Sequence, residues 1–332
     1  MHKRKLPLFL SQLVIIGLLV TGCSQAAPAT TTPSTTPPAT STAPAEDPAK
    51  VIKTAVETYF NDIGSKVTDS YKIPEKDLKE ALDKTPDKYV VLDIRKADAY
   101  AVGHIKGAIN VPYGADIATN LDAIRAIAKD KTLIVACYTG QTAGQTDSLL
   151  NVAGIKTLSL NSGMGGSATV GFETRGWLGQ KFPTVTEATA MPTAPAVATK
   201  SKAIDTAVQK YFNELPKDSN KIELPAMKEA LATAADKYYM VDVRKAVDFE
   251  KGHIKGAVNF PYGPDIAKNL DSIKDKSAGK TVVVYCYTGQ TAGQTDSLLN
   301  IAGIPTKSLN FGFGMEGFTK GWSSDPTFEI VK

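Results

Sequence analysis

The chain has 332 residues, of which 42% are hydrophobic and 22% charged, and this ordinary globular composition is sufficient for two domains with apolar cores. Its formal net charge of +4 comes mostly from Lys3, Arg4 and Lys5, because the residues after position 22 include 35 basic and 34 acidic side chains. The sequence has no basic stripe and no interleaving of aromatic and basic residues. Charge therefore excludes nucleic acid as an expected partner.

The first 23 residues have the pattern of an export signal. Residues 2–5 are basic, and the apolar run over residues 6–20 is too short for a comfortable transmembrane span. The Val-Thr-Gly-Cys motif that ends at Cys23 resembles the lipobox of bacterial lipoproteins. This resemblance implies a signal peptide over residues 1–22 and a lipid on Cys23, which would anchor an exported protein to a bacterial membrane, facing the periplasm or the cell exterior. The alternative is an uncleaved membrane anchor.

Two segments rich in Ala, Thr and Pro divide the rest of the chain. Residues 23–48 contain almost nothing that a core could bury, and they predict a disordered tether. Residues 182–201 have a similar composition and predict a linker. We therefore expect one domain over residues 49–181 and a second over residues 202–332.

These two parts are copies of one sequence. Residues 137–151 match residues 286–300 at every position, and Cys137 lies 149 positions before Cys286. Each copy opens with an amphipathic helix, since its apolar residues recur at helical spacing. The residues of that apolar face are Ile52, Ala55, Val56, Tyr59 and Phe60 in the first copy, and Ile204, Ala207, Val208, Tyr211 and Phe212 in the second.

The remaining elements of each copy alternate between strands and helices. In the first copy they are predicted as a helix over 75–84, a strand over 89–94, a short strand over 108–111, a helix over 116–128, a buried strand over 133–136, a helix that ends near Gly154, and a strand over 157–160. The second copy follows the same order, with its second helix over 225–233. Such alternation predicts a mostly parallel sheet with helices on both faces. The loops after Ile94, Ala136 and Leu160 would then meet at one edge of the sheet.

Each copy places a cysteine between a buried strand and a helix. Cys137 follows the apolar run Leu133-Ile134-Val135-Ala136, and Cys286 follows Val282-Val283-Val284-Tyr285. At a helix N-terminus, free backbone N–H groups and the helix dipole favour a thiolate or a bound anion. We therefore predict that Cys137 and Cys286 are nucleophiles. The alternatives are an inert buried cysteine, or a disulfide if both loops face each other.

Three motifs occur in the same order in both copies. Leu92-Asp93-Ile94-Arg95 and Val241-Asp242-Val243-Arg244 come first, a Gly-His-Ile-Lys-Gly-Ala stretch around His104 or His253 comes second, and the Cys-x-x-Gly loop comes third. Together they resemble the rhodanese domain over about residues 50–180 and 200–330. The resemblance implies a five-stranded, mostly parallel sheet flanked by helices in each domain. It also implies sulfur transfer through a cysteine persulfide.

The loop after each cysteine is expected to bind the substrate anion through its backbone N–H groups, with threonine hydroxyls as further donors. These residues are Tyr138, Thr139, Gly140, Gln141, Thr142 and Ala143, and Tyr287, Thr288, Gly289, Gln290, Thr291 and Ala292. Many active rhodaneses carry an Arg in this loop, where Thr142 and Thr291 stand here. Its absence should weaken binding of a dianion such as thiosulfate. Related phosphatases need an Arg where Ala143 and Ala292 stand, so phosphatase activity is not expected.

Four charged residues and two histidines are expected to support the site. Asp93 with Arg95, and Asp242 with Arg244, are predicted as buried ion pairs or loop caps, with direct substrate contact as the alternative. His104 and His253 are predicted to tie their loops by hydrogen bonds, and a general base is the alternative. The sequence shows no Cys-x-x-Cys motif and no histidine cluster, so we expect neither a metal nor another cofactor. The Gly-rich residues 161–166 suggest a flexible wall of the crevice.

The sequence favours an exported, membrane-tethered sulfurtransferase with two competent sites. Its expected partners are a small sulfur-containing substrate or a sulfur-accepting protein, besides the lipid that anchors it. A second hypothesis is a module that carries persulfide sulfur to one dedicated partner and turns over poorly on free thiosulfate. A catalytically silent interaction domain is less favoured, because such domains commonly lose the cysteine and both copies retain it here.

Overall fold

The computed structural model describes residues 46–167, 172–316 and 318–332. The expected signal peptide, Cys23 and most of the expected tether lie outside these residues. The first helix, α1, begins at Pro48, and the side chain of Asp47 caps it by accepting a hydrogen bond from the Ala49 N–H group. The first described helix therefore begins one residue before the boundary expected at residue 49.

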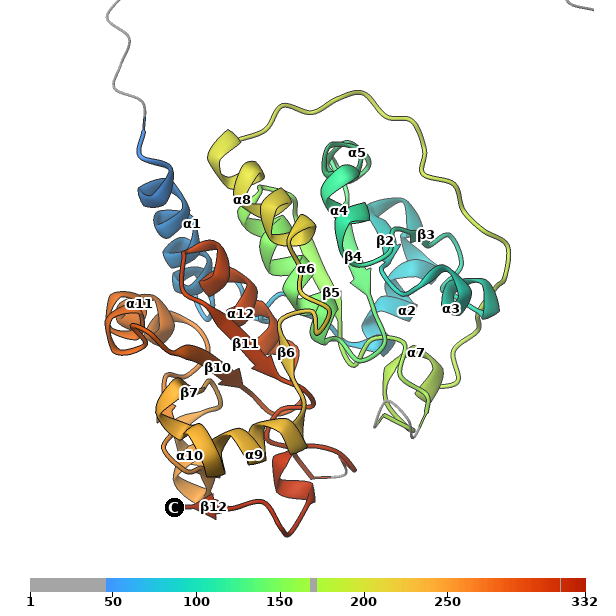
Figure 1. Cartoon of the computed structure of the whole chain (residues 1–332). Coiled ribbons are helices and arrows are strands. Elements are labelled where there is room, and N and C mark those ends of the chain that lie inside the picture. The colour runs from blue at the N-terminus through green and yellow to red at the C-terminus, as the bar shows by residue number, and fades with distance from the viewer. Residues whose placement is uncertain (1–45, 168–171, 317) are drawn as a thin grey trace, which may run out of the picture. The chain divides into compact units, whose positions relative to one another are not determined.

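The first repeat alternates short strands with helices (Figure 1). Its elements are α1 (Pro48–Asp62), β1 (Lys72–Ile73), α2 (Glu75–Lys84), β2 (Tyr89–Asp93), α3 (Ala97–Val102), β3 (Ile109–Asn110), α4 (Ala115–Thr119), α5 (Leu121–Ile127), β4 (Thr132–Ala136), α6 (Gln141–Val152), β5 (Thr157–Leu160) and α7 (Gly176–Gly179). The five strands form a parallel sheet in the order β1-β5-β4-β2-β3. Strand β4 is central and buried along its whole length, as its run of apolar residues predicts.

The second repeat has the same arrangement. Its elements are α8 (Lys202–Asn213), β6 (Lys221–Ile222), α9 (Leu224–Ala234), β7 (Tyr238–Asp242), α10 (Ala246–Lys251), β8 (His253–Ile254), β9 (Val258–Asn259), α11 (Pro264–Lys276), β10 (Thr281–Tyr285), α12 (Gln290–Ile301), β11 (Thr306–Leu309) and β12 (Ile330–Val331). The parallel sheet runs β6-β11-β10-β7-β9, and β8 pairs with β12 in a separate antiparallel ladder. Two five-stranded parallel sheets with helices on both faces confirm the predicted fold class.

Alternate residues of the central strand face two different cores. Leu133 and Val135 of β4 belong to a large apolar cluster, whereas Ile134 and Ala136 belong to a smaller one with Leu78 of α2. The large cluster continues through α6 and α12 into the second repeat. The inner faces of the two sheets therefore share one core, and each outer face has a core of its own.

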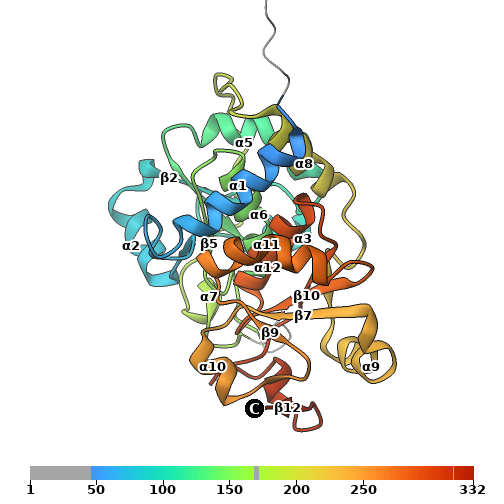
Figure 2. The same ribbon diagram turned by 90° about the vertical axis from the view of Figure 1, so that its left-hand side faces the viewer.

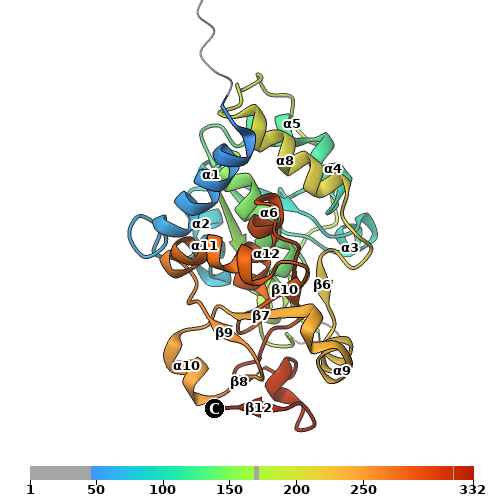
Figure 3. The ribbon, with the colours of Figure 1, turned by 60° about the vertical axis from the view of Figure 1, so that its left-hand side comes forward.

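The first helix of each repeat packs mainly against the other repeat. Helix α1 lies along α11 of the second repeat (Figure 2), and α8 lies along α4 of the first (Figure 3). The residues of the predicted apolar faces, such as Phe60 and Phe212, are buried in the shared core. Residues 46–332 form one compact unit, and the two repeats share one apolar core within it.

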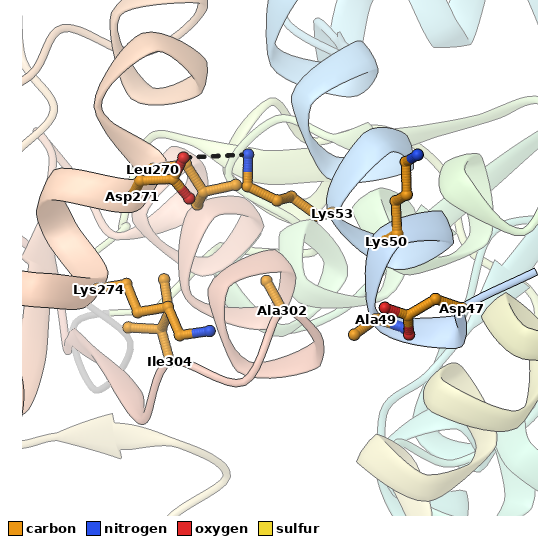
Figure 4. A pocket seen from close by; sticks show the side chains of 9 residues that line it. All are labelled: Asp47, Ala49, Lys50, Lys53, Leu270, Asp271, Lys274, Ala302 and Ile304. Carbon is orange, nitrogen blue, oxygen red and sulfur yellow. Dashed lines mark hydrogen bonds and ion pairs between the residues drawn. The ribbon is translucent and has the colours of Figure 1, made fainter.

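Two charged pairs agree with this arrangement, in which the first helix of each repeat packs against the other repeat. Arg125 of α5 is buried and pairs with Asp205 of α8 at 2.6 Å. In the other half, Lys53 of α1 pairs with Asp271 of α11 at 3.3 Å, at the rim of a cavity of about 280 Å³ (Figure 4). Lys53 occupies the position in α1 that Asp205 occupies in α8. If α1 lay on its own repeat, Lys53 would face Arg125, and this like-charge contact disfavours the unexchanged packing.

Helices α6 and α12 pack directly against each other at the centre of the molecule (Figure 3). Their backbones approach closely because both helices carry a glycine there. A Cβ atom on Gly144 would lie 2.5 Å from the Gln290 carbonyl oxygen, and one on Gly293 would lie 2.5 Å from that of Gln141. The hydroxyls of Ser148 and Ser297 meet at 2.8 Å. The helices that follow the two cysteines are therefore joined at the shared core.

One further prediction differs from the structure. The helix expected over residues 116–128 is interrupted at Asn120, whereas α11 is continuous; Thr119 stands where the second repeat has Lys268, a better helix former. The first part of the expected linker lies along the first repeat, because Val185 pairs with His104 and Thr189 pairs with Ile109.

Candidate functional site

Cys137 lies at the carboxyl end of β4, where the topology brings several loops together. In the register of the sheet, Ala136 pairs with Asp93 at the end of β2. The chain then turns through Gly140, which has φ +93° and precedes the first residue of α6, Gln141. A left-handed backbone at this position favours glycine over other residues. Cys286 occupies the same position after β10, followed by Gly289 with φ +98°.

Backbone N–H groups surround each sulfur. The Gly140 and Ala143 N–H groups donate to Cys137 Sγ at 3.1 and 3.3 Å, and Gly289 donates to Cys286 Sγ at 3.1 Å. The first N–H groups of a helix have no partner within the helix, so here the sulfur satisfies them. They also carry the positive end of the helix dipole. Both thiols are free and nearly fully buried, with exposed fractions of 1% and 2%.

A second stretch of backbone holds each cysteine loop from behind. The Met164 N–H group donates to the Cys137 carbonyl at 2.7 Å, and Gly165 donates to the Tyr138 carbonyl at 2.9 Å. Gly163, with φ +58°, packs so closely that a Cβ there would lie 2.4 Å from the Cys137 carbonyl oxygen. Phe313 and Gly314 make the same bonds in the second repeat. The interpretation of residues 161–166 as a flexible wall is therefore wrong, because this stretch is a bonded support of the loop.

The acidic and basic residues beside each loop form buried ion pairs. Arg95 Nη2 lies 2.6 Å from Asp93 Oδ2, and Arg244 Nη2 lies 2.6 Å from Asp242 Oδ2. The same Arg95 atom donates to the Gly103 carbonyl at 2.8 Å, which ties the end of β2 to the loop that holds His104. Each guanidinium thus has its main partners inside the protein.

The two histidines have backbone partners. His104 is fully buried, stacks on Tyr100, and has Nδ1 2.8 Å from the Tyr100 carbonyl and Nε2 3.0 Å from the Glu187 carbonyl. His253 stacks on Phe249 and has Nδ1 3.1 Å from its carbonyl. These contacts hold both imidazole rings against the backbone of their loops. Among the described residues, neither histidine contacts a cysteine sulfur.

The side chains of the cysteine loop point in different directions. Tyr138 is 41% exposed, and the threonines Thr139 and Thr142 are half-buried. The hydrogen bonds to the two sulfurs come from backbone N–H groups throughout the described residues, and not from the threonine hydroxyls. Gln141 and Gln290 are buried, and their side chains enter the other repeat.

A pocket of about 390 Å³ opens beside the second cysteine loop. It is lined by residues from the loops after β7, β10 and β11, including Arg244, Tyr287 and Phe313. The Arg244 guanidinium lies 3.7 Å from the centre of the Phe313 ring, and Cys286 lies one residue before Tyr287. The three strand ends therefore meet at one crevice, as the topology predicts.

The two sites differ at the tyrosine next to the cysteine. Tyr287 donates to Asp248 at 2.5 Å, and burial together with this bond raises the pKa of Tyr287 to about 12. In the first repeat Ala99 stands at the position of Asp248, so Tyr138 lacks this carboxylate partner. Sequence inspection missed Asp248 because this difference lies outside the shared motifs.

Two further findings apply to the described residues alone. No three His, Cys, Asp or Glu side chains among them lie close enough together to hold a metal ion. Within residues 46–167, 172–316 and 318–332, no helix is both long and apolar enough to cross a membrane.

The sheet topology and the cysteine loops define an α/β protein whose repeats each hold a buried cysteine at the N-terminus of a helix. A family model for the rhodanese-like domain matches residues 75–166 and again residues 224–322, which together make up more than half of the chain. The chain therefore belongs to the rhodanese family.

Individual relatives match parts of the chain. Over 65 residues, which are 20% of the chain, it is 31% identical to the thiosulfate sulfurtransferase PspE of Escherichia coli K12, and the match spans 61% of that relative. Thiosulfate sulfurtransferase from Pseudomonas aeruginosa is 23% identical, with 84% of this chain and 49% of that one covered at a TM-score of 0.29. A rhodanese-related protein from Thermoplasma volcanium is also 23% identical, with 35% and 98% covered at a TM-score of 0.28.

Proposed function

We propose that the protein is a sulfurtransferase that moves sulfane sulfur from a small donor to a thiophilic acceptor through persulfides on Cys137 and Cys286. The observation that carries this proposal is the set of backbone N–H groups around each sulfur. Membership of the rhodanese family supports sulfur transfer in general. The thiosulfate sulfurtransferase among the relatives supports thiosulfate as a donor.

The reaction consists of two displacements at sulfur. First, the cysteine thiolate attacks the outer sulfur of thiosulfate, the S–S bond of the donor breaks, and sulfite leaves with its electron pair. The cysteine then carries a persulfide anion. Second, an acceptor thiolate, sulfite or cyanide attacks the outer sulfur, and the cysteine leaves as a thiolate. Negative charge stays near the loop in both states, where the fixed N–H dipoles stabilise it.

Both repeats are proposed to be competent. The two loops have the same sequence, and each places the N–H group of its left-handed glycine 3.1 Å from the sulfur. Neither loop carries an arginine or lysine between the cysteine and the glycine of the crossing helix, Gly144 or Gly293. Within the loop itself, the anion is therefore expected to be held by N–H groups and the helix dipole rather than by a cationic side chain.

Steady-state kinetics with thiosulfate and cyanide test this function. Because sulfite leaves before cyanide reacts, we expect ping-pong behaviour, with parallel double-reciprocal lines as the cyanide concentration is varied. Intersecting lines would contradict a covalent intermediate.

A persulfide-carrying delivery module is the second candidate. The near-complete burial of both sulfurs and the lack of a cation in the loop favour it, since both features disfavour reaction with a free dianion. In this case thiosulfate would load the cysteines once without turnover on cyanide, and a sulfur-accepting protein would be the partner. Continuous cyanide turnover favours the enzyme.

Export and lipid attachment are also part of the proposal. They rest on residues 1–23, whose sequence resembles a lipoprotein signal and which lie outside the described residues. We expect the protein to fractionate with membranes in its bacterial host and to become soluble in the Cys23→Ser variant. Membrane association that persists in this variant would contradict lipid anchoring at Cys23.

A further inference from the structure

The first residue of each cysteine helix extends its side chain into the other repeat. Gln290, at the start of α12, donates through Nε2 to Ser159 Oγ at 2.8 Å and to the Leu160 carbonyl at 3.3 Å. Gln141, at the start of α6, donates to Ser308 Oγ at 2.8 Å and to the Leu309 carbonyl at 3.4 Å. Both glutamines are 2% exposed. These side chains therefore cross the shared core in both directions.

Gln290 contacts the part of the first repeat that holds Cys137. Its Oε1 atom packs on Gly140, where a Cβ would lie only 2.8 Å away, and the Gly140 N–H group donates to the Cys137 sulfur. Its Nε2 atom binds the end of β5 at Leu160, and the chain from there leads to Met164, whose N–H group binds the Cys137 carbonyl. Gln290 thus joins the front of the Cys137 loop to its support.

Gln141 makes the same contacts with the second repeat. Its Oε1 atom would lie 2.7 Å from a Cβ on Gly289, the residue that donates to the Cys286 sulfur. Its Nε2 atom binds the end of β11 at Leu309, and the following residues lead to Phe313, whose N–H group binds the Cys286 carbonyl. The contacts are therefore reciprocal: each glutamine belongs to one cysteine loop and contacts the cysteine loop of the other repeat.

We propose that Gln290 is a positioning residue for Cys137 and that Gln141 is a positioning residue for Cys286. Each sulfur site is thus completed by a side chain from the other repeat. The inference rests on the proposed sulfur transfer, because positioning of the loop is useful only if the cysteine reacts. The position of each glutamine in the sequence suggests that it binds the anion in its own loop. The inference instead assigns it to the loop of the other repeat.

A crossed set of variants of the full-length protein tests this assignment. Cys286→Ser leaves only the Cys137 site, and Cys137→Ser leaves only the Cys286 site. Gln141→Ala and Gln290→Ala are introduced separately into each, and sulfur uptake from thiosulfate is followed by rapid quench and intact-mass spectrometry. In the Cys137-only chain, Gln290→Ala should slow uptake by about tenfold or more, because small misplacement of a reacting group is costly. Gln141→Ala should have the smaller effect there.

The order of the two effects must reverse in the Cys286-only chain. If each glutamine instead affects mainly the cysteine of its own loop, or if both variants slow both cysteines equally, the inference is overturned. If the single-cysteine chains without glutamine changes take up no sulfur, the proposed function fails and the positioning role is judged by hydrogen exchange alone.

Hydrogen exchange gives the readout that does not need activity. Peptides that cover Gly140 to Ala143 should lose protection in Gln290→Ala, and peptides that cover Gly289 to Ala292 should lose it in Gln141→Ala. The peptides must extend beyond residues 137–151 or 286–300, because the two repeats have the same sequence within these ranges. Gln290→Met and Gln141→Met, which keep most of the side-chain volume but lose the hydrogen bonds, serve if the alanine variants do not fold. The same crossed pattern is expected from them, and its absence overturns the inference.

Discussion

We expect replacement of both cysteines by serine to abolish sulfur transfer, and replacement of either one to leave about half of the activity. The expected loss in the double variant is at least about a thousandfold, because removal of a nucleophile removes the covalent route. Cys137→Ser and Cys286→Ser should each keep the other site working, since each sulfur has its own N–H donors. The thiosulfate–cyanide assay measures all three variants.

Serine is close to cysteine in size, so these variants should retain the fold, and circular dichroism with thermal unfolding provides the control. If the folded double variant still transfers sulfur, neither cysteine is the nucleophile. If one single variant loses all activity, only the repeat changed in it is competent, and the claim of two working sites is wrong.

Stability should fall as pH rises above the ordinary range of carboxyl groups, because of two aspartates in the shared core. Asp147 of α6 and Asp296 of α12 are fully buried, and burial raises the pKa of each well above its usual value. Gln294 donates to Asp147 at 3.1 Å, and Gln145 donates to Asp296 at 3.0 Å. The charges of Lys72 and Lys221 act to lower the two pKa values, but burial is the larger effect and raises them. At pH values between the ordinary carboxyl pKa and the raised one, each of these aspartates is therefore expected to keep a proton in the folded protein that the unfolded chain has lost.

The sign of the effect follows from proton linkage. Between the ordinary carboxyl pKa and the raised one, the folded state binds more protons, so the free energy of unfolding decreases with increasing pH. Each aspartate contributes a slope of up to about 1.4 kcal/mol per pH unit in that window. The Asp147→Asn/Asp296→Asn variant carries neutral side chains at every pH, and this part of the slope should disappear.

Denaturant unfolding at a series of pH values above 4 measures the difference between this variant and the wild type. The exposed Asp275, changed to Asn, is the matched control and should keep the wild-type slope. A wild-type slope that survives in the double-asparagine variant would show that these carboxyl groups are ionised in the folded protein.

The elements that local sequence patterns specify could be predicted. The run Leu133-Ile134-Val135-Ala136 is buried on both faces and becomes a central strand, and the strand over residues 157–160 has the predicted bounds. The glycine after each cysteine indicates the turn into the helix, because its left-handed backbone needs that residue. Local pattern thus placed each cysteine at a helix N-terminus.

The contacts between the repeats could not be predicted. Because the two copies are so similar in sequence, the sequence does not show whether a side chain packs against its own repeat or against the other one. The apolar face of α1 fits either sheet, and its place on the second repeat depends on packing and on pairs such as Lys53 with Asp271. For the same reason Gln141 and Gln290 were expected to serve their own loops. The support from residues 161–166 was missed because glycine-rich sequence suggests mobility, while here it permits close backbone approach.

The central claim is that two cysteines, each surrounded by backbone N–H groups, carry sulfur. Intact-mass spectrometry of the full-length protein after thiosulfate treatment tests this claim most directly. The protein is desalted and measured without reductant, together with the three serine variants. We expect the wild type to gain the mass of two sulfur atoms, each single variant to gain one, and the double variant to gain none. A folded wild-type protein that gains no sulfur, or a double variant that does, would contradict the account.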